Sequence, residues 1–331
     1  MRFRRRTLLG WASATSAAAV STAVLGCDRD AAGGPVVLAG EAERPRSEGE
    51  RTRGPTAAPP GTASAGPRPD GDWHELELAP TIEHGEPGRV VIKVNPGAPI
   101  LLALHGAGEN KKGLVGGSRG FRDDYDLGRC DGRLRAPPLT EADLLGFVDP
   151  GRLAKLNASL AARPYGGLTV ACPFTPWITD VAGARRWASW LEQELLPKVR
   201  QVAGAPSDAP IGVDGISMGG RLALLLGCAR PDLFETFGAA QPAIRPDEVA
   251  YFANVVHDAQ AQRRRPLRLI SSHGDFYLEA IREFSGKLAR RKIAHELVVT
   301  PGPHDYPWNR GPGCTEMLLW HDRALRGQTP V

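Results

Sequence analysis

Short apolar runs alternate with helical stretches along most of the chain, from about residue 89 onward. Continuous apolar runs of this length are typical of strands that are buried on both faces of a parallel sheet. The runs predict strands at 89–94, 99–104, 168–172, 211–214, 237–240, 267–271 and 296–300. Helical patterns lie between them, at about 182–202, 219–228, 246–263, 276–292 and 315–325. This alternation predicts an α/β fold, with a mostly parallel, doubly wound sheet and helices on both faces.

One segment interrupts the alternation. Residues from about 108 to 166 are too many for an ordinary connection between a strand and a helix. We expect helices near 141–145 and 151–162 within it, forming a cap or side wall over the site. With this insertion, residues 72–331 form the predicted folded domain.

The first 27 residues have the pattern of an export signal. A basic start precedes a mildly apolar stretch rich in Ala, Ser and Thr, which is too weakly apolar for a confident membrane span. Arg5-Arg6-Thr7-Leu8-Leu9 resembles the twin-arginine signal of proteins that are exported already folded. Val24-Leu25-Gly26-Cys27 resembles a bacterial lipobox, in which Cys27 is lipidated and becomes the mature N-terminus. The alternative is a plain cleaved signal in which Cys27 is incidental.

Residues 28–71 are rich in Pro, Gly, Ala, Ser, Arg and Glu and have no apolar periodicity. Such a segment cannot recover the entropy cost of folding, and it predicts a disordered tether. Together the two N-terminal segments predict an exported protein, periplasmic or on the cell surface, held to the membrane through a lipid anchor only.

Charge excludes one class of partner. Residues 1–26 hold four arginines and no acid, which equals the whole formal net charge of +4. The near-neutral remainder argues against a nucleic-acid binder, which needs a surplus of Lys and Arg. No C-x-x-C, H-E-x-x-H or phosphate-binding glycine loop occurs, so neither a metal nor a nucleotide cofactor is implied. The oligomeric state is left open.

Two serines fit the motif G-x-S-x-G, at Gly215–Gly219 and at Gly116–Gly120. The motif alone is weak because the chain has 39 glycines. Ser217 follows an apolar strand and precedes the helical stretch RLALLLGCA, which is the context of a nucleophile elbow. Ser118 lies in a polar stretch with no strand before it. We therefore predict Ser217 as the nucleophile, the alternative being a helix N-cap in a non-catalytic sheet.

A serine nucleophile needs a base, and the base needs an acid to orient it. In a doubly wound sheet both are expected on loops at the carboxyl ends of later strands. Asp275 follows the strand at 267–271, and His304 follows the strand at 296–300. Ser217, Asp275 and His304 follow one another in the order Ser, Asp, His that this architecture uses. His273 and Asp305 are weaker rivals.

The tetrahedral intermediate of acyl transfer needs two backbone N–H donors. One is expected from Met218, directly after the nucleophile. The other is expected from the loop after the strand at 99–104, with Ala107 favoured and Gly106 as the alternative. His105 is expected to brace this loop through its ring.

These motifs resemble those of the α/β-hydrolases, and more narrowly the putative-esterase, or esterase D-like, group. The resemblance covers about 89–326 and rests on LLALHGAG, GISMGG, ARPDLFETFGAAQPA, SSHGDFYL and GPHDYPWN. It implies an esterase-like hydrolase acting on a small-molecule, glycan or siderophore-type ester. The stretch after the first glycine loop is longer and more polar than usual, so substrate contacts there do not transfer. Trp177 and Trp308 are the candidates for substrate binding, with ordinary packing as the alternative for Trp177.

Four cysteines lie in the predicted domain. Cys172 is on a predicted core strand and Cys228 is near a helix end, so both suit burial as thiols. Cys130 and Cys314 lie in Gly-rich stretches and are the expected disulfide in an exported protein.

The sequence thus predicts a serine esterase that works through an acyl-enzyme. An acyltransferase using the same three residues is the enzymatic alternative, and a non-catalytic binding lipoprotein of the same fold is the alternative of another class.

Overall fold

The computed structural model describes residues 73–80 and 87–330. The predicted export signal, with Cys27, and the predicted tether lie outside these residues. The described chain folds around an eight-stranded sheet of order β1-β2-β4-β3-β5-β6-β7-β8. The strands are β1 (Trp73–Pro80), β2 (Pro87–Lys93), β3 (Ile100–Leu104), β4 (Thr169–Pro173), β5 (Ile211–Gly215), β6 (Thr236–Ala240), β7 (Leu267–Gly274) and β8 (Glu296–Pro303).

The sheet is mostly parallel, as the apolar runs predict. β1 pairs with β2, and β2 with β4, in antiparallel register, whereas β3 to β8 are all parallel to one another. Strands β3 to β6 are buried along their whole length, which explains their unbroken apolar sequence. β1 was not predicted because most of its positions are exposed or half-buried and its sequence, WHELELAP, is polar.

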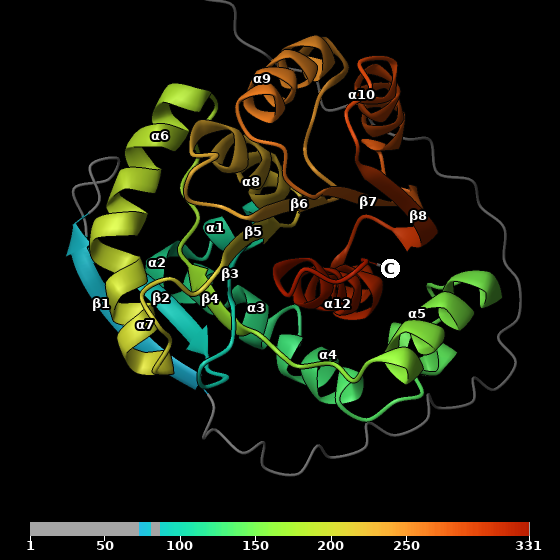
Figure 1. The fold of residues 1–331 in the computed structure, drawn as a ribbon, viewed down its shortest axis with the longest axis horizontal. Helices are drawn as coiled ribbons and strands as arrows, with labels where there is room; N and C mark the ends of the chain where they lie inside the picture. The colour runs from blue at the N-terminus through green and yellow to red at the C-terminus, as the bar shows by residue number, and fades with distance from the viewer. Residues whose placement is uncertain (1–72, 81–86, 331) are drawn as a thin grey trace, which may run out of the picture. The chain divides into compact units, whose positions relative to one another are not determined.

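Helices cover both faces of the sheet (Figure 1). One face carries α6 (Val181–Trp190), α7 (Leu196–Ala203), α8 (Met218–Ala229), α9 (Val249–Gln262) and α10 (Leu278–Arg290). The other carries α4 (Leu127–Leu134), α5 (Pro150–Ala162) and α12 (Cys314–Leu325). Each face has its own cluster of buried apolar side chains, so the sheet separates two halves of the core.

The long segment at about 108–166 forms part of this core. It contributes the short helices α1 (Ala107–Asn110), α2 (Gly113–Ser118) and α3 (Gly120–Asp123), followed by α4 and α5. The predicted helix at 151–162 is α5, and the one at 141–145 is a single 3₁₀ turn at Glu141–Leu144. Phe121, Leu127, Leu134 and Leu156 are fully buried and belong to the same apolar cluster as α12. The segment is therefore a packed layer against the sheet and more than a cap.

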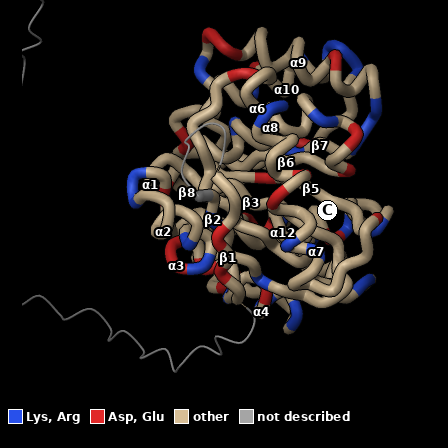
Figure 2. Tube along the Cα trace, turned by 90° about the vertical axis from the view of Figure 1, so that its left-hand side faces the viewer, with Lys and Arg blue, Asp and Glu red and all other residues tan. Residues whose placement is uncertain are grey.

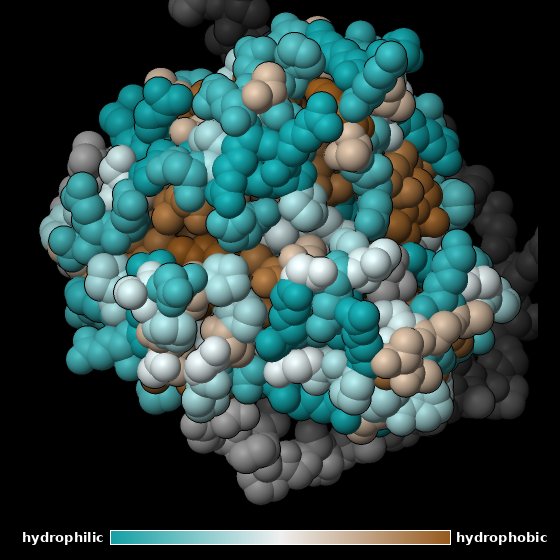
Figure 3. Space-filling model, viewed as in Figure 1, coloured by the Kyte–Doolittle hydropathy of each residue, from teal (hydrophilic) through white to brown (hydrophobic). Residues whose placement is uncertain are grey.

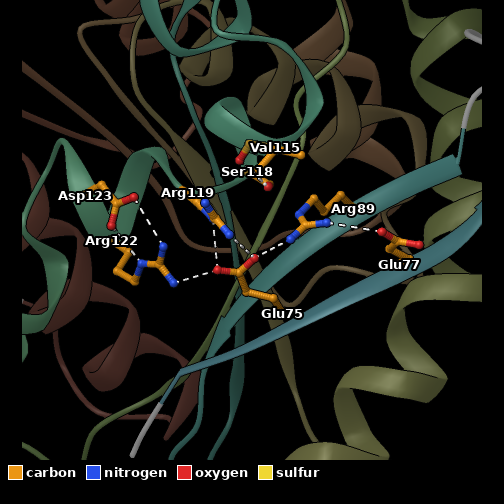
Figure 4. A network of polar contacts seen from close by, with 8 residues as sticks. All are labelled: Glu75, Glu77, Arg89, Val115, Ser118, Arg119, Arg122 and Asp123. Carbon is orange, nitrogen blue, oxygen red and sulfur yellow. Dashed lines mark hydrogen bonds and ion pairs between the residues drawn. The ribbon is translucent and has the colours of Figure 1, made fainter. Parts of the chain in front are cut away.

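An ion network fastens the edge strand β1 to this segment (Figure 4). The Glu75 carboxylate accepts hydrogen bonds from Arg119 at 2.8 and 2.9 Å, from Arg122 at 2.8 Å and from Arg89. These hydrogen bonds, chiefly that from Arg119, lower the pKa of Glu75 to about 2 even though partial burial opposes them. Glu75 thus stays ionised and holds β1 against α3 over a wide pH range.

The surface of the described residues is mixed in charge and hydropathy. Positions of Lys and Arg are interspersed with positions of Asp and Glu along the Cα trace (Figure 2). Hydrophilic side chains cover most of the face drawn in Figure 3, with separate hydrophobic patches between them. Within residues 73–80 and 87–330, no helix combines the length and the apolar character needed to cross a bilayer.

Candidate active site

Ser217 lies at a sharp turn between β5 and α8. Its backbone has φ +58° and ψ −114°, a conformation that is strained for a residue with a side chain. The neighbouring backbone holds the turn in place, because the Ser217 N–H donates to the Ala240 carbonyl at 2.9 Å and the Ile216 N–H to that of Leu104 at 3.0 Å. This strand–turn–helix arrangement is the one that the GISMGG motif predicts.

Two glycines make the turn sterically feasible. A Cβ atom at position 219 would lie 2.0 Å from the Leu104 carbonyl oxygen, and one at position 215 would lie 2.4 Å from the Gly219 carbonyl carbon. Both positions therefore allow only glycine without a shift of the backbone. The close approach of α8 to β3 brings the Ser217 loop next to the loop that follows β3.

Ser217 and two side chains from other strand ends, those of His304 and Asp275, form a chain of hydrogen bonds. The Ser217 hydroxyl lies 3.0 Å from His304 Nε2, and His304 Nδ1 lies 2.8 Å from Asp275 Oδ1. Asp275 is in the loop after β7 and His304 in the loop after β8. Since an ionised carboxylate only accepts, Nδ1 carries the ring proton and Nε2 is free to accept the serine proton.

The Asp275 carboxylate is itself fixed by its surroundings. The Ser271 hydroxyl donates to Oδ2 at 2.6 Å, and the Tyr277 N–H donates to Oδ1 at 2.9 Å. The Asp275 side chain has no exposed surface, whereas that of His304 is 13% exposed. The arrangement can therefore hold the imidazole by a buried carboxylate while its other nitrogen faces the serine.

The loop after β3 is braced by His105, as predicted. The Thr175 N–H donates to His105 Nε2 at 2.9 Å, so that Nδ1 carries the proton and donates to the Gly106 carbonyl at 3.0 Å. Burial lowers the pKa of His105 to about 4, and the ring is neutral at physiological pH.

The predicted oxyanion donors differ in their surroundings. Met218 is the first residue of α8 and Ala107 the first residue of α1, positions at which an N–H has no acceptor within its helix. The Gly106 N–H, in contrast, donates to the Tyr125 hydroxyl at 3.0 Å. Of the two residues proposed for the second donor, Ala107 thus keeps its N–H available, whereas Gly106 does not.

The two predicted substrate-binding tryptophans have opposite environments. Trp177, in the loop after β4, is 62% exposed. Trp308 is fully buried, and its indole N–H donates to the Thr300 hydroxyl at 2.8 Å. The prediction for Trp308 is therefore wrong: its ring fills the core behind the His304 loop, since its apolar body and its single donor are both satisfied there.

An aromatic residue that the sequence analysis missed stands next to the imidazole. Phe276 is 71% exposed, and its ring centroid lies 4.4 Å from that of His304. Its position directly after Asp275 was the available signal. Phe276 thus lies against the His304 ring and leaves most of its own ring exposed to solvent.

The three rival residues do not take part in the hydrogen-bonded chain from Ser217 to Asp275. Ser118 is buried at the end of α2, where its hydroxyl donates to the Val115 carbonyl at 3.0 Å. The Asp305 carboxylate accepts the Trp308 N–H at 3.2 Å and caps the short helix α11 (Tyr306–Trp308). His273 is exposed beyond the buried part of β7.

The predicted disulfide is not present. Cys130 and Cys314 are free, buried thiols, and Cys130 donates to the Arg310 carbonyl. The Gly-rich stretches that suggested exposed loops are packed instead, since Cys130 lies in α4 and Cys314 begins α12. A hydrogen bond from Cys314 lowers the pKa of Cys130, and burial raises that of Cys314.

A second group of three side chains resembles the one at Ser217. The Thr236 hydroxyl lies 2.8 Å from His321 Nδ1, and His321 Nε2 lies 3.0 Å from Asp214 Oδ2. Asp214 and His321 have no exposed surface, and Thr236 is 1% exposed. No substrate reaches this group. Within the described residues, no cluster of three His, Cys, Asp or Glu side chains is arranged to hold a metal ion.

Comparison with known families gives a match over part of the chain. Residues 170–308, which are less than half of the chain and include Ser217, Asp275 and His304, match the model of the family described as putative esterase. The prediction of a carboxylic ester hydrolase is confirmed. A comparison with curated proteins finds no match.

Solved structures of esterases share the fold of this hydrolase. A ferulic acid esterase has a TM-score of 0.53 and 16% identity over 74% of this chain and 98% of its own. The S-formylglutathione hydrolase of Staphylococcus aureus has a TM-score of 0.50 and 12% identity over 72% of this chain and 94% of its own. At such identities the likeness concerns the fold, and the predicted α/β-hydrolase fold is confirmed.

Proposed function

We propose that the protein is a serine esterase in which Ser217, His304 and Asp275 form the catalytic triad. The observation that carries this proposal is the continuous hydrogen-bonded chain from the Ser217 hydroxyl through the imidazole to the buried carboxylate. His304 takes the hydroxyl proton as Ser217 Oγ attacks the ester carbonyl carbon. Asp275 keeps the ring in the required tautomer and stabilises the imidazolium that forms.

The remaining steps use the same groups. The N–H groups of Met218 and Ala107 stabilise the negative oxygen of the tetrahedral intermediate. His304 then gives its proton to the leaving alcohol as the carbon–oxygen bond breaks, leaving the acyl group on Ser217. Water, deprotonated by His304, attacks this acyl-enzyme and releases the acid, which returns the enzyme to its initial state.

Hydrolysis of p-nitrophenyl acetate by three proteins tests the proposal. Ser217→Ala is expected to lose about 10⁶-fold in kcat, as removal of a triad nucleophile does elsewhere. Ser118→Ala is the matched control, because it removes the other serine with the same motif, and it is expected to keep wild-type kcat. In addition, a fluorophosphonate probe is expected to label the wild type at Ser217 and to leave Ser217→Ala unlabelled. Equal rates for wild type and Ser217→Ala, or labelling of another residue, would overturn the proposal.

For the substrate, we propose a small-molecule ester with an aromatic group. Support comes from the exposed rings of Trp177 and Phe276, which lie in loops at the same edge of the sheet as Ser217, and from the fold neighbour that is a ferulic acid esterase. Methyl ferulate is expected to have a higher kcat/KM than methyl butyrate, and Trp177→Ala is expected to reduce this preference. A preference for the aliphatic ester would contradict the substrate class and leave the triad unaffected.

For its location, we propose that the enzyme is exported and anchored outside the cytoplasm by lipid on Cys27. The support is the sequence of residues 1–27 alone. Expression in bacteria fed with radioactive palmitate is expected to label the wild type in the membrane fraction and to leave Cys27→Ser unlabelled. Equal recovery of wild type and Cys27→Ser as unlabelled, released protein would favour the plain cleaved signal.

A further inference from the structure

A buried carboxyl group lies directly behind the loop that supplies the second oxyanion donor. Glu109 belongs to α1, which begins next to Gly106, and is only 1% exposed. The Tyr125 hydroxyl donates to Glu109 Oε2 and at the same time accepts the Gly106 N–H at 3.0 Å. Two buried hydrogen bonds thus link the Gly106 N–H to the Tyr125 hydroxyl and that hydroxyl to Glu109.

This chain determines which N–H groups of the loop remain available. A phenol has one proton to donate, and Tyr125 donates it to Glu109, so its oxygen remains an acceptor for Gly106. The Gly106 N–H is therefore directed inward, and the next one along the chain is that of Ala107.

The peptide group that joins Gly106 to Ala107 is fixed through the Gly106 carbonyl. The Gly106 carbonyl accepts a hydrogen bond from His105 Nδ1 at 3.0 Å and another from the Asn110 N–H at 3.2 Å. In a trans peptide the C=O and N–H bonds point in opposite directions, so holding the carbonyl also sets the direction of the Ala107 N–H. Tyr125 fixes the preceding peptide and the His105 ring fixes this one, which leaves the Ala107 N–H little freedom to turn.

The partners of Glu109 come from separate parts of the chain. Tyr125 lies in the long segment, two residues after α3, and its ring packs edge-on against Phe121 with centroids 4.9 Å apart. Tyr306, two residues after His304, lies beside the same carboxyl, and both burial and Glu109 raise the pKa of its hydroxyl. The carboxyl therefore connects the oxyanion loop with the long segment and with the His304 loop.

We infer that Glu109 and Tyr125 are positioning residues for the oxyanion hole: Glu109 orients the Tyr125 hydroxyl, and Tyr125 holds the Gly106 N–H inward so that the Ala107 N–H faces the reacting oxygen. This inference rests on the proposed function, because it assumes that the Ala107 N–H is a donor in ester cleavage. It gives the long segment a role in catalysis that does not require contact with the substrate.

The test measures kcat, KM and the affinity for an aryl trifluoromethyl ketone. Ser217 Oγ adds to the carbonyl carbon of this ketone, His304 takes the serine proton, and the former carbonyl oxygen of the tetrahedral adduct carries the negative charge. Activity is expressed per site titrated with a fluorophosphonate, so that unfolded protein does not count. Tyr125→Phe keeps the ring and removes the hydroxyl. It is expected to lower kcat about 10- to 100-fold, less than the loss of a donor itself, with KM nearly unchanged. The ketone affinity is expected to fall by the same factor as kcat/KM.

Four further variants separate positioning from general stability. Glu109→Gln keeps an acceptor oxygen for Tyr125 and is expected to retain most of kcat, whereas Glu109→Ala is expected to lose as much as Tyr125→Phe. The double variant Tyr125→Phe/Glu109→Ala is expected to have a kcat no lower than that of either single variant, since both changes break the same chain of hydrogen bonds. Tyr165→Phe, at another buried tyrosine of the long segment, is the matched control and is expected to leave kcat and ketone affinity unchanged.

The inference is overturned if Tyr125→Phe and Glu109→Ala retain the wild-type kcat and ketone affinity per titrated site. It is also overturned if Tyr165→Phe loses as much as Tyr125→Phe, because the effect would then be one of general packing. Failure of the proposed function would look different, since the wild type would then show no Ser217-dependent activity or labelling at all.

Discussion

Three histidines differ in their surroundings and therefore in their chemistry. His304 is partly exposed and lies between Ser217 and Asp275, whereas His105 and His321 are buried. Burial lowers the pKa of both buried rings, so they are neutral and act through fixed tautomers. Only a ring within hydrogen-bond distance of the serine hydroxyl can serve as its general base, and of these three the ring 3.0 Å from Ser217 is that of His304.

The carboxylate at position 275 is expected to matter for rate more than for binding. Asp275→Asn presents an amide to His304 Nδ1, which favours the tautomer with the proton on Nε2. We expect kcat for p-nitrophenyl acetate to fall about 10⁴-fold with little change in KM. Because Asp275 is also held by Ser271 and the Tyr277 N–H, circular dichroism should verify that the variant is folded. A fall of less than 10-fold would argue against the assigned role.

The neutral His105 predicts a pH dependence of stability. Burial lowers its pKa from the ordinary histidine value of 6.5 to about 4 in the folded protein. Below pH 6.5 the unfolded chain therefore binds a proton that the folded protein does not. The contribution of His105 to the free energy of unfolding is expected to be fully present above pH 6.5. It is expected to decrease toward pH 4, by up to roughly 3 kcal/mol.

Urea unfolding of wild type and His105→Gln between pH 4 and 8 measures this contribution. The variant is expected to be less stable at pH 7 and to lose less stability on acidification. His321, whose pKa burial also lowers, acts in the same direction and is unchanged in the variant. Parallel stability curves for the two proteins would contradict the expectation.

Among the elements, the turn between β5 and α8 depends most strictly on the absence of side chains. Gly219→Ala would place a Cβ atom 2.0 Å from the Leu104 carbonyl oxygen. We expect this change to destabilise the fold by about 3 kcal/mol or more and to abolish esterase activity. Gly132→Ala, within α4, is the control because no atom lies within 4 Å of its Cβ, and it is expected to stabilise the protein by about 0.5–1 kcal/mol. Thermal unfolding of the two variants would distinguish the positions, and equal effects would contradict the steric argument.

The elements that the sequence predicted are those with strong periodicity. The buried strands and the helices between them follow from unbroken apolar runs, because a strand covered on both faces has no polar positions. β1 escaped prediction since it is an edge strand, half-exposed and fixed by the ion network at Glu75. The long segment was misjudged in part because its helices are short, and short helices take their stability from packing that the sequence does not display.

For the candidate site, residues next to strand ends were predictable and residues reached through packing were not. Ser217, Asp275 and His304 each follow a recognisable strand, so the parallel topology brings them to one edge. Tyr125 and Glu109 contact each other and the oxyanion loop only because the long segment folds against that loop. No pattern in the sequence predicts this packing. Trp308 was misassigned because an aromatic residue near a site is equally suited to the core.

At the scale of the whole molecule, the reactivity of the buried thiols measures whether both halves of the core are folded, because each half contains at least one of them. Cys130, Cys172, Cys228 and Cys314 are free and buried, and burial raises the pKa of Cys228 to about 12. In a Cys27→Ser background, we expect none of the four to react with Ellman's reagent in the native protein and all four to react in guanidinium. Only two reactive thiols after unfolding would mean that Cys130 and Cys314 are oxidised after all.

The buried group of Thr236, His321 and Asp214 has a consequence for recognising enzymes from coordinates. It contains a hydroxyl, an imidazole and a carboxylate at distances as short as those around Ser217. A search by interatomic distance alone would return both groups and could not rank them. What distinguishes them is whether an ester can arrive from solvent. The same polypeptide therefore contains a group with the three functional groups of a catalytic triad that is closed off from solvent.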